Sequence, residues 1–219
     1  MEQINLELKA EANNYPSFQL TDRHLCDIEL IMNGGFNPLN GFMSKIDYDS
    51  VVNNMRLGDG SLWSMPITLD ATDEFISEIS NSSKITLRDK EGFVLAMLKI
   101  QDIWQPDLEI EAKLVFGTND IKHPGVNYLM KTSKRNYIGG KIEKVSLPHH
   151  YDFNKLRHSP NQLKSIFKAK KWDKVIAFQT RNPLHRAHFE LTIRAMKELN
   201  ANLLVHPVIG MTRPGDINH

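Results

Sequence analysis

Apolar residues in the first two-thirds of the chain fall into short segments, several of which alternate with polar residues as strands do. Asp89-Lys90-Glu91-Gly92 separates two of these segments and has the composition of a hairpin turn. The expected strands are 63–69, with Pro66 indicating an edge or bulge, 84–87, 93–103, and 141–147, which Gly139-Gly140 introduces. The expected helices are 21–33, 109–116 and 126–130. This pattern predicts a β-rich α+β domain without internal repeats.

The helix expected over 21–33 has clear boundaries. Thr21 is a suitable N-cap, and Gly34 is a suitable end. The glycine-containing loop 33–39 could be taken for a phosphate loop, but a helix C-cap and turn packed by phenylalanines explains it better. The single cysteine, Cys26, lies among apolar residues of this helix, so we expect a buried structural thiol rather than a catalytic one.

Residues 148–160 are polar and rich in residues that break helices and strands, which indicates a domain boundary. Ser159-Pro160-Asn161-Gln162 is a capping box with proline at the first helical position, so a helix should follow. The pair His149-His150 is expected to be solvated, because a metal site would need further ligands at workable spacing. We therefore place one domain at 1–158 and a second at 159–219.

The second domain contains a strand–turn–helix–strand pattern. Val175 to Phe178 is an apolar run, and Pro183 suits the first helical position with Asn182 as N-cap. The apolar stripe of the helix is Ala187, Leu191, Ala195 and Leu199. A second apolar run, 203–205, starts another strand. Such β-α-β units form parallel sheets, so this part is predicted to be an incomplete α/β Rossmann-like domain.

The turn between this strand and helix carries side chains suited to an anion. Ligands of open α/β sheets bind beyond the carboxyl ends of strands, and a helix N-terminus attracts anions through its N–H groups and dipole. Arg181 supplies a planar guanidinium, and His185 and His188 share one face of the first helical turn. The neutral donors are Gln179, Thr180 and Asn182. The sequence therefore predicts an anion site with two imidazoles and no glycine-rich cradle.

The stretch Gln179-Thr180-Arg181-Asn182-Pro183-Leu184-His185-Arg186-Ala187-His188 resembles the ATP sulfurylase (sulfate adenylyltransferase) signature Q-T/N-R-N-P-x-H-x-x-H at every specified position. Its HxxH is a version of the nucleotidyltransferase HxGH element. The segment beginning Asn33-Gly34-Gly35-Phe36 is similar to one in the family's PUA-like N-terminal domain. The resemblance covers this whole chain but only about half of the family's length, and the remainder would hold a second nucleotide-binding motif. Gly215-Asp216-Ile217-Asn218 stands where members often have G-D-I-D, a minor departure.

The resemblance implies adenylyl transfer from ATP to sulfate, giving adenosine 5′-phosphosulfate and pyrophosphate, with Mg²⁺ entering on ATP and no tightly bound metal. Sulfate is already ionised, so the reaction needs positioning and charge neutralisation rather than a general base or covalent nucleophile. Arg181 and Gln179 would bind sulfate. Thr180 and Asn182 would bind and orient the phosphate chain, and His185 and His188 would donate to α- and β-phosphate oxygens. All six residues would contact ATP, and all except Gln179 count as catalytic. The full-length protein would be a homo-oligomer.

Several alternatives remain at this point. The histidines could bind Zn²⁺, although the usual helical pair is four apart and a third ligand is not evident. They could be core residues, or the turn could serve another HxGH-type nucleotidyltransferase. This chain could also be a non-catalytic fragment or scaffold that retains anion binding. Arg213 follows the second strand and is either on the rim of the site or a surface residue.

Composition narrows the classes of function. The chain has 219 residues, a formal net charge of +1 and 41% hydrophobic residues, enough for one sizeable core or two smaller ones. Its basic bias after Lys171 is modest, which argues against a nucleic-acid partner. No apolar run reaches the roughly 20 residues that a membrane helix needs. A polar N-terminus and one cysteine lead us to expect a cytoplasmic protein.

Overall fold

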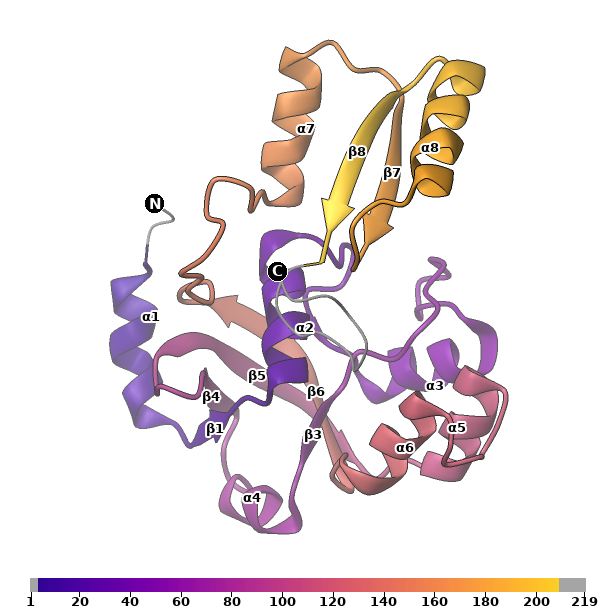
Figure 1. The fold of residues 1–219 in the computed structure, drawn as a ribbon. Helices are drawn as coiled ribbons and strands as arrows, with labels where there is room; N and C mark the ends of the chain where they lie inside the picture. Colours follow the sequence, from indigo (N-terminus) through magenta and orange to yellow (C-terminus); the bar gives the residue numbers. More distant parts are fainter. Residues whose placement is uncertain (1–3, 209–219) are drawn as a thin grey trace. The chain divides into compact units, whose positions relative to one another are not determined.

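The computed structural model describes residues 4–208, and its contacts divide the chain after Arg157 into two compact units. Figure 1 follows the helices and strands of both units along the chain. No helix among residues 4–208 is long and apolar enough to cross a membrane.

A mixed six-stranded sheet forms the centre of the first unit (Figure 1). Its strands are β1 (Ser17–Gln19), β2 (Gly41–Phe42), β3 (Leu69–Ala71), β4 (Lys84–Arg88), β5 (Val94–Trp104) and β6 (Asn136–Lys144). The order is β1-β4-β5-β6-β2, and β3 also pairs with β6. The pair β1–β4 is parallel, whereas the other pairs are antiparallel. With its helices, this sheet makes the first unit α+β, as the apolar pattern predicted.

Helices cover this sheet and extend from its edges. They are α1 (Leu6–Glu11), the 3₁₀-helix η1 (Ala12–Asn14), α2 (Asp22–Asn33), α3 (Lys45–Asn54), α4 (Asp73–Glu78), α5 (Leu108–Phe116) and α6 (Pro124–Lys131). The boundaries predicted for α2 are confirmed: the Thr21 hydroxyl accepts a hydrogen bond from the His24 N–H at 3.3 Å, and Gly34 follows in the left-handed region with φ 83°. Helices α3, α5 and α6 lie together in Figure 1.

Apolar side chains from both faces of the sheet build the core. The main cluster includes Leu69, Ile85, Leu87 and Leu98, all fully buried, and each such side chain stabilises the fold by about 1.5–3 kcal/mol. A smaller cluster joins Met97 of β5 to residues of η1 and of the segment after β6. Burial on both faces fixes the strand register, because a slip of one residue would exchange the two faces.

Asp70 of β3 is the centre of a buried polar network. Its Oδ1 accepts hydrogen bonds from Arg23 Nη2 at 2.6 Å and contacts His24 Nε2 at 2.8 Å, while Oδ2 accepts from the Lys134 N–H at 2.8 Å. Burial alone would raise the pKa of Asp70, but the hydrogen bond from His24, that from Lys134 and the charge of Arg23 outweigh it and lower the pKa to about 2. The network ties α2, β3 and the approach to β6 together.

A second buried carboxylate, Glu111 of α5, accepts hydrogen bonds from two phenols. Its Oε2 lies 2.8 Å from the Tyr48 hydroxyl and 3.1 Å from the Tyr137 hydroxyl. Burial raises the pKa of Glu111, although both hydrogen bonds oppose that rise. Trp104 packs against both tyrosine rings, with centroids 5.5 and 5.9 Å away. This cluster joins α3, α5 and the β5–β6 pair.

Two predicted strands have other boundaries in the structure. Of the segment expected as a strand over 63–69, only Leu69 belongs to a strand, β3. Pro66 has no N–H to donate to a ladder. The Met65 carbonyl accepts a hydrogen bond from the Trp63 indole at 2.7 Å. The last strand begins at Asn136 rather than 141, so Gly139-Gly140 lies inside β6.

Gly139 and Gly140 allow a close approach of other chain segments. A Cβ at Gly139 would lie 2.3 Å from the Met43 carbonyl oxygen, and one at Gly140 would lie 2.1 Å from the Lys99 carbonyl oxygen. No real Cβ lies so close to another atom. These two glycines therefore allow other backbone segments to lie close to β6, and they do not mark the start of a strand.

Two predictions about single side chains are also wrong. Cys26 is exposed on α2, not buried. Its thiol is nevertheless partly desolvated at the helix surface, and this desolvation, with the nearby carboxylates of Asp27, Glu29 and Asp22, raises the pKa of the thiol, which agrees with a non-catalytic cysteine. In the pair expected to be solvated, His149 is exposed, but His150 is only 31% exposed and its Nε2 lies 2.8 Å from Glu29 Oε1 of α2.

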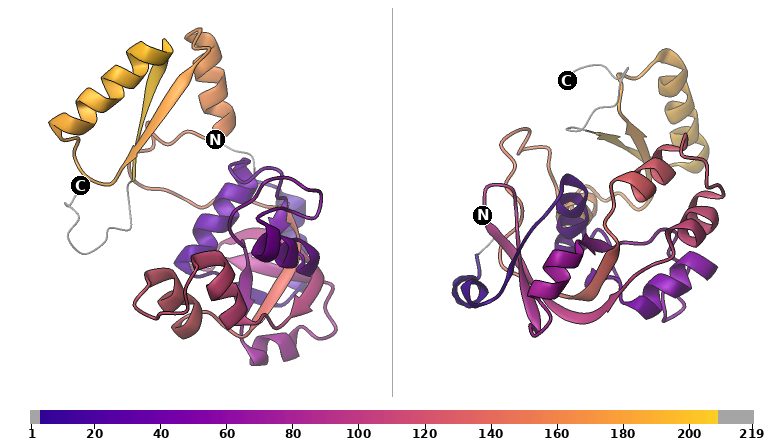
Figure 2. Two further views of the ribbon diagram at one scale, coloured as in Figure 1. Left: turned by 90° about the vertical axis from the view of Figure 1, so that its right-hand side faces the viewer. Right: turned by 90° about the horizontal axis from the view of Figure 1, so that it is seen from below.

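The second unit contains α7 (Pro160–Ala169), β7 (Val175–Thr180), α8 (Arg186–Leu199) and β8 (Asn202–Pro207). The capping box predicted for α7 is present, with the Ser159 N–H donating to Gln162 Oε1 at 2.8 Å. β7 and β8 are parallel, pairing from Val175↔Asn202 to Thr180↔Pro207. Figure 2 shows this strand pair between α7 and α8, so helices cover both of its faces.

Candidate functional site

The predicted anion site lies at the carboxyl end of β7 and the start of α8. The helix was expected to begin at Pro183 with Asn182 as N-cap, and that prediction is wrong. α8 begins at Arg186, and its N-cap is His185, with φ −74° and ψ 159°. Asn182 is instead held inside the preceding turn by Thr180, which removes it from the capping position.

The N-terminus of α8 differs from those of the other α-helices among residues 4–208. Each of the seven others has a side chain that accepts a hydrogen bond from the first turn, but α8 has no side-chain cap. The N–H groups of a first turn have no partner within the helix, and they carry the positive end of its dipole. An anion can take the place of the missing cap.

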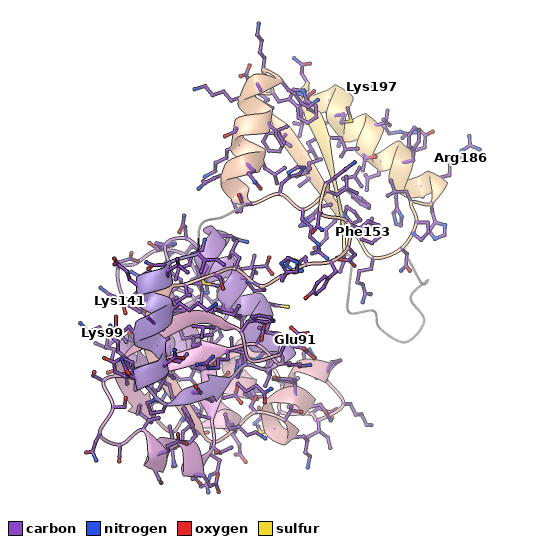
Figure 3. The ribbon with its side chains drawn as sticks, turned by 90° about the vertical axis from the view of Figure 1, so that its left-hand side faces the viewer. Glu91, Lys99, Lys141, Phe153, Arg186 and Lys197 are labelled. Atoms are coloured by element: carbon purple, nitrogen blue, oxygen red, sulfur yellow. The ribbon has the colours of Figure 1, made fainter. Side chains whose placement is uncertain are left out.

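The structure brings the two motif histidines together at this helix end. His185 is the N-cap and His188 lies three residues on, and their ring centroids are 5.7 Å apart. Both side chains are exposed, so both imidazoles can reach a ligand. Arg186, between them, is labelled at the start of α8 in Figure 3 and extends away from the strands.

Phe178 of β7 supports this arrangement and was not singled out from the sequence. Its ring centroid lies 5.5 Å from that of His188, at an interplanar angle of 43°. The contact joins β7 to the first turn of α8 and restricts the orientation of the imidazole. The sequence signal was available, because Phe178 is the last apolar residue before the polar turn.

Thr180 shapes the turn through both functions of its hydroxyl. Its Oγ1 donates to the Asn182 carbonyl oxygen at 2.5 Å and accepts from the Asn182 N–H at 3.2 Å. Asn182 is half-buried, while Gln179 and Arg181 are exposed. The six predicted residues therefore occupy one short segment, Gln179 to His188, around an uncapped helix end.

His206 of β8 is a further imidazole at this end of the sheet, and sequence reasoning missed it. It lies directly opposite Gln179 in the parallel pair, and both side chains are exposed. Residues directly opposite on neighbouring strands present their side chains to the same face. Arg213, expected on the same rim, lies outside the described residues, as does Gly215-Asp216-Ile217-Asn218.

The chemistry of the turn favours an anion over a metal ion. Guanidinium, amide and N–H groups donate hydrogen bonds to oxyanions, whereas Zn²⁺ requires three or four His, Cys or carboxylate ligands. Among residues 4–208 no group of three such side chains is placed to hold a metal. The Zn²⁺ alternative therefore receives no support from this part of the chain, and the exposure of both histidines within it argues against the core alternative.

Two family models match the sequence of this chain. Residues 2–147 match the family described as PUA-like domain, and residues 154–219 match the ATP-sulfurylase family. The chain belongs to the PUA-like domain family. It is thus an α+β protein in which a PUA-like domain with a mixed sheet precedes a segment that is similar to the ATP-sulfurylase family.

Curated relatives cover nearly all of this chain. Sulfate adenylyltransferases of Gibberella zeae and Coccidioides immitis are 51% and 54% identical to it over 216 residues. These alignments cover 97% of this chain but 38% of each relative, so the chain spans well under half of their length. A solved structure titled hexameric APS kinase from Thiobacillus denitrificans is 32% identical, with a TM-score of 0.76, and the match covers 96% of this chain and 38% of that one.

Proposed function

We propose that this protein is a sulfate adenylyltransferase, which transfers the adenylyl group of ATP to sulfate and releases pyrophosphate. The observation that carries the proposal is the uncapped N-terminus of α8, with His185 and His188 beside it and Arg181 in the preceding turn. The curated relatives of that name, about half identical to this chain, support the same activity. They also favour it over another nucleotidyltransferase of the HxGH type.

In the proposed reaction a sulfate oxygen attacks the α-phosphorus of ATP in line with the departing pyrophosphate. One P–O bond forms to sulfate as the P–O bond to pyrophosphate breaks. Arg181 and Gln179 bind sulfate. Thr180 was expected to bind the phosphate chain together with Asn182, but its hydroxyl forms both of its hydrogen bonds within the turn, so we assign the phosphate contact to Asn182 and the shape of the turn to Thr180. His185 and His188 donate to α- and β-phosphate oxygens as negative charge develops on them. Sulfate is ionised at neutral pH, so no residue has to remove a proton.

Mg²⁺ is proposed to enter with ATP, bound to its phosphate oxygens. The donors of the turn suit this division of roles, because guanidinium and amide N–H groups donate hydrogen bonds to phosphate oxygens. When bound, the ion neutralises charge on the transferred nucleotide. The residues of this chain then orient the nucleotide relative to sulfate.

We also propose that residues 1–158 form the PUA-like domain and that residues 159–219 form part of a Rossmann-like nucleotidyltransferase domain. The parallel β7–β8 pair with helices on both faces supports this assignment (Figure 2). α8 exposes Phe189, Leu191 and Leu199, which are 53%, 61% and 57% accessible. Leu191 and Leu199 are eight residues apart and share one face of α8, so we propose that further protein covers this face. Segments outside this chain would therefore complete the site, in a homo-oligomer.

The proposal is tested by the reverse reaction, the formation of ATP from adenosine 5′-phosphosulfate and pyrophosphate. We expect activity from a form extended beyond His219 to the length of the curated relatives, and none from this chain alone. An extended form that is folded but makes no ATP would overturn the proposal. Retained phosphate or sulfate binding without turnover in both forms would instead favour a non-catalytic anion-binding protein. Native mass spectrometry of the extended form tests the homo-oligomer.

A further inference from the structure

Three lysines lie at one level of three neighbouring strands in the first unit. The register pairs Lys84 of β4 with Lys99 of β5, and Lys99 with Lys141 of β6. Directly opposite residues on adjacent strands present their side chains to the same face of the sheet. Figure 3 shows Lys99 and Lys141 side by side on the surface of this unit. The row therefore concentrates three positive charges.

Only one member of the row is neutralised. Lys84 Nζ lies 2.9 Å from Glu11 Oε1 and 2.8 Å from Glu143 Oε2. Lys99 and Lys141 are exposed, and neither forms an ion pair with any residue in the range 4–208. Like charges directly opposite each other destabilise a sheet. The exposed ammonium groups of Lys99 and Lys141 are therefore accessible to an anionic ligand.

Lys141, which lies opposite Lys99 in the register, lines a polar cavity of about 340 Å³, whereas Lys99 is outside the lining. Lys141 and Gln101 line it together with the backbone of Gly41 and Gly140, and Asp47 and Asp59 line it as well. Its volume is at the lower end of the range of roughly 300–1,000 Å³ for small-molecule sites. The cavity therefore suits a small ligand rather than a macromolecule.

The two aspartates determine which anion fits. Asp47 Oδ1 accepts from the Gly58 N–H at 2.9 Å, and Asp59 Oδ1 accepts from the Ser61 N–H at 2.8 Å. Each carboxylate oxygen has a second lone pair available for a hydroxyl donor. A bare dianion would be repelled by these carboxylates, whereas a ligand that also carries hydroxyl groups would be bound by them.

We propose that this cavity binds a small phosphate or sulfate monoester that carries several hydroxyl groups, with a sugar phosphate as the simplest example. Lys99 and Lys141 hold the ester oxyanion, and Asp47 and Asp59 accept hydrogen bonds from the hydroxyls. This site lies wholly in the first unit and does not depend on the activity proposed for the second.

The test is an NMR titration of the ¹⁵N-labelled chain with ribose 5-phosphate, and separately with ribose and inorganic phosphate. We expect saturable shifts at the Gly41, Gln101, Gly140 and Lys141 amides with ribose 5-phosphate, and at least tenfold weaker responses to the other two. The double variant K99Q/K141Q should bind at least tenfold more weakly. The control K113Q/K122Q removes the same charge from exposed lysines of the same unit and should bind as the parent does.

Three results would overturn the proposal. The first is equal binding by K99Q/K141Q and K113Q/K122Q, which would assign the shifts to net charge. The second is a linear response that does not saturate, which would show only nonspecific attraction. The third is saturation by an oligonucleotide but not by ribose 5-phosphate. Asp59→Asn should weaken ribose 5-phosphate without weakening inorganic phosphate, and equal weakening of both would contradict the assigned role of the carboxylate.

Discussion

Thr180 and Asn182 are joined by two hydrogen bonds through a single hydroxyl, which donates to the Asn182 carbonyl oxygen at 2.5 Å and accepts from its N–H at 3.2 Å. The hydroxyl proton is thus used within the turn. Thr180 accordingly acts on a bound anion through the shape of the loop that carries Arg181.

Thr180→Val should remove both hydrogen bonds, whereas Thr180→Ser should keep them. We expect the valine variant to lose about 1–2 kcal/mol of local stability and to shift the Arg181 and Asn182 amide resonances. The serine variant should resemble the parent in NMR spectra and, in an active extended form, in kcat/KM. If serine abolished activity while the Asn182 resonance stayed in place, the methyl group and not the turn would be the important feature.

His188→Ala in an active extended form should lower kcat with little change in ATP affinity. A donor that acts mainly as charge develops in the transition state is worth a rate factor of about 10²–10³. Steady-state kinetics and equilibrium ATP binding measure the two quantities separately. His149→Ala, an exposed histidine of the linker, is the control and should leave both unchanged. Equal losses in binding and in kcat/KM would contradict the role assigned to His188.

Asp27, which forms an ion pair with Arg23 on α2, should make the first unit less stable as the pH rises. Burial raises its pKa to about 6 from 3.8, although the charge of Arg23 opposes that rise. Because the pKa of Asp27 is higher in the folded state, the protonated carboxyl contributes to the free energy of unfolding. This contribution is fully present below about pH 4 and is lost as the pH rises through 6. The stability difference between the parent and Asp27→Asn should therefore shift by on the order of 2–3 kcal/mol across this window.

Urea unfolding at several pH values, followed by resonances of the first unit, measures this difference. Burial lowers the pKa of His24, so the neutral imidazole contributes to the stability of the first unit above pH 6.5. This contribution is lost as the pH falls, so His24 makes the unit less stable at low pH, whereas Asp27 makes it less stable at high pH. Comparing variant with parent cancels that effect. Asp49→Asn, in an exposed pair with Lys45, is the control. A constant difference between parent and Asp27→Asn from pH 4 to 7 would show that Asp27 ionises normally.

Lys99→Glu should stabilise the first unit and remove ligand binding at the same time. The new carboxylate would lie opposite Lys141 and beside Lys84, and a favourable cross-strand pair is worth about 0.2–1 kcal/mol. Thermal unfolding should show a higher Tm for Lys99→Glu than for the control Lys113→Glu. A lower Tm would mean that the lysine pair is already favourable, and the argument for a bound anion would lose its first step.

Local signals in the sequence predicted the elements whose ends depend on neighbouring residues. Thr21 and Gly34 bound α2, and Ser159 with Gln162 caps α7, because caps act within one turn of their helix. The prediction for the start of α8 was wrong because another local interaction competes with the cap. Asn182 and Pro183 are good starting residues, but the hydroxyl of Thr180 binds Asn182 first, and no periodic pattern records that competition.

Interactions between distant residues could not be predicted from the pattern. Asp70 binds Arg23 and His24 across sequence separations of 47 and 46 residues, and nothing in its local sequence distinguishes it from an exposed aspartate. The motif from Gln179 to His188 was visible because its residues are contiguous. The uncapped helix end beside it became apparent only in the structure.

The close approach at Gly41 and Gly140 decides how the cavity of the first unit can change by mutation. A Cβ at Gly41 would lie 1.9 Å from the Gly140 carbonyl oxygen, and one at Gly140 would lie 2.1 Å from the Lys99 carbonyl oxygen, so neither of these two lining positions can carry a side chain. Substitutions that change the ligand preference of the cavity, whether engineered or evolved, must therefore lie at lining positions that carry side chains, such as 59, 101 and 141. Homologues that keep both glycines can therefore bind different ligands in this cavity.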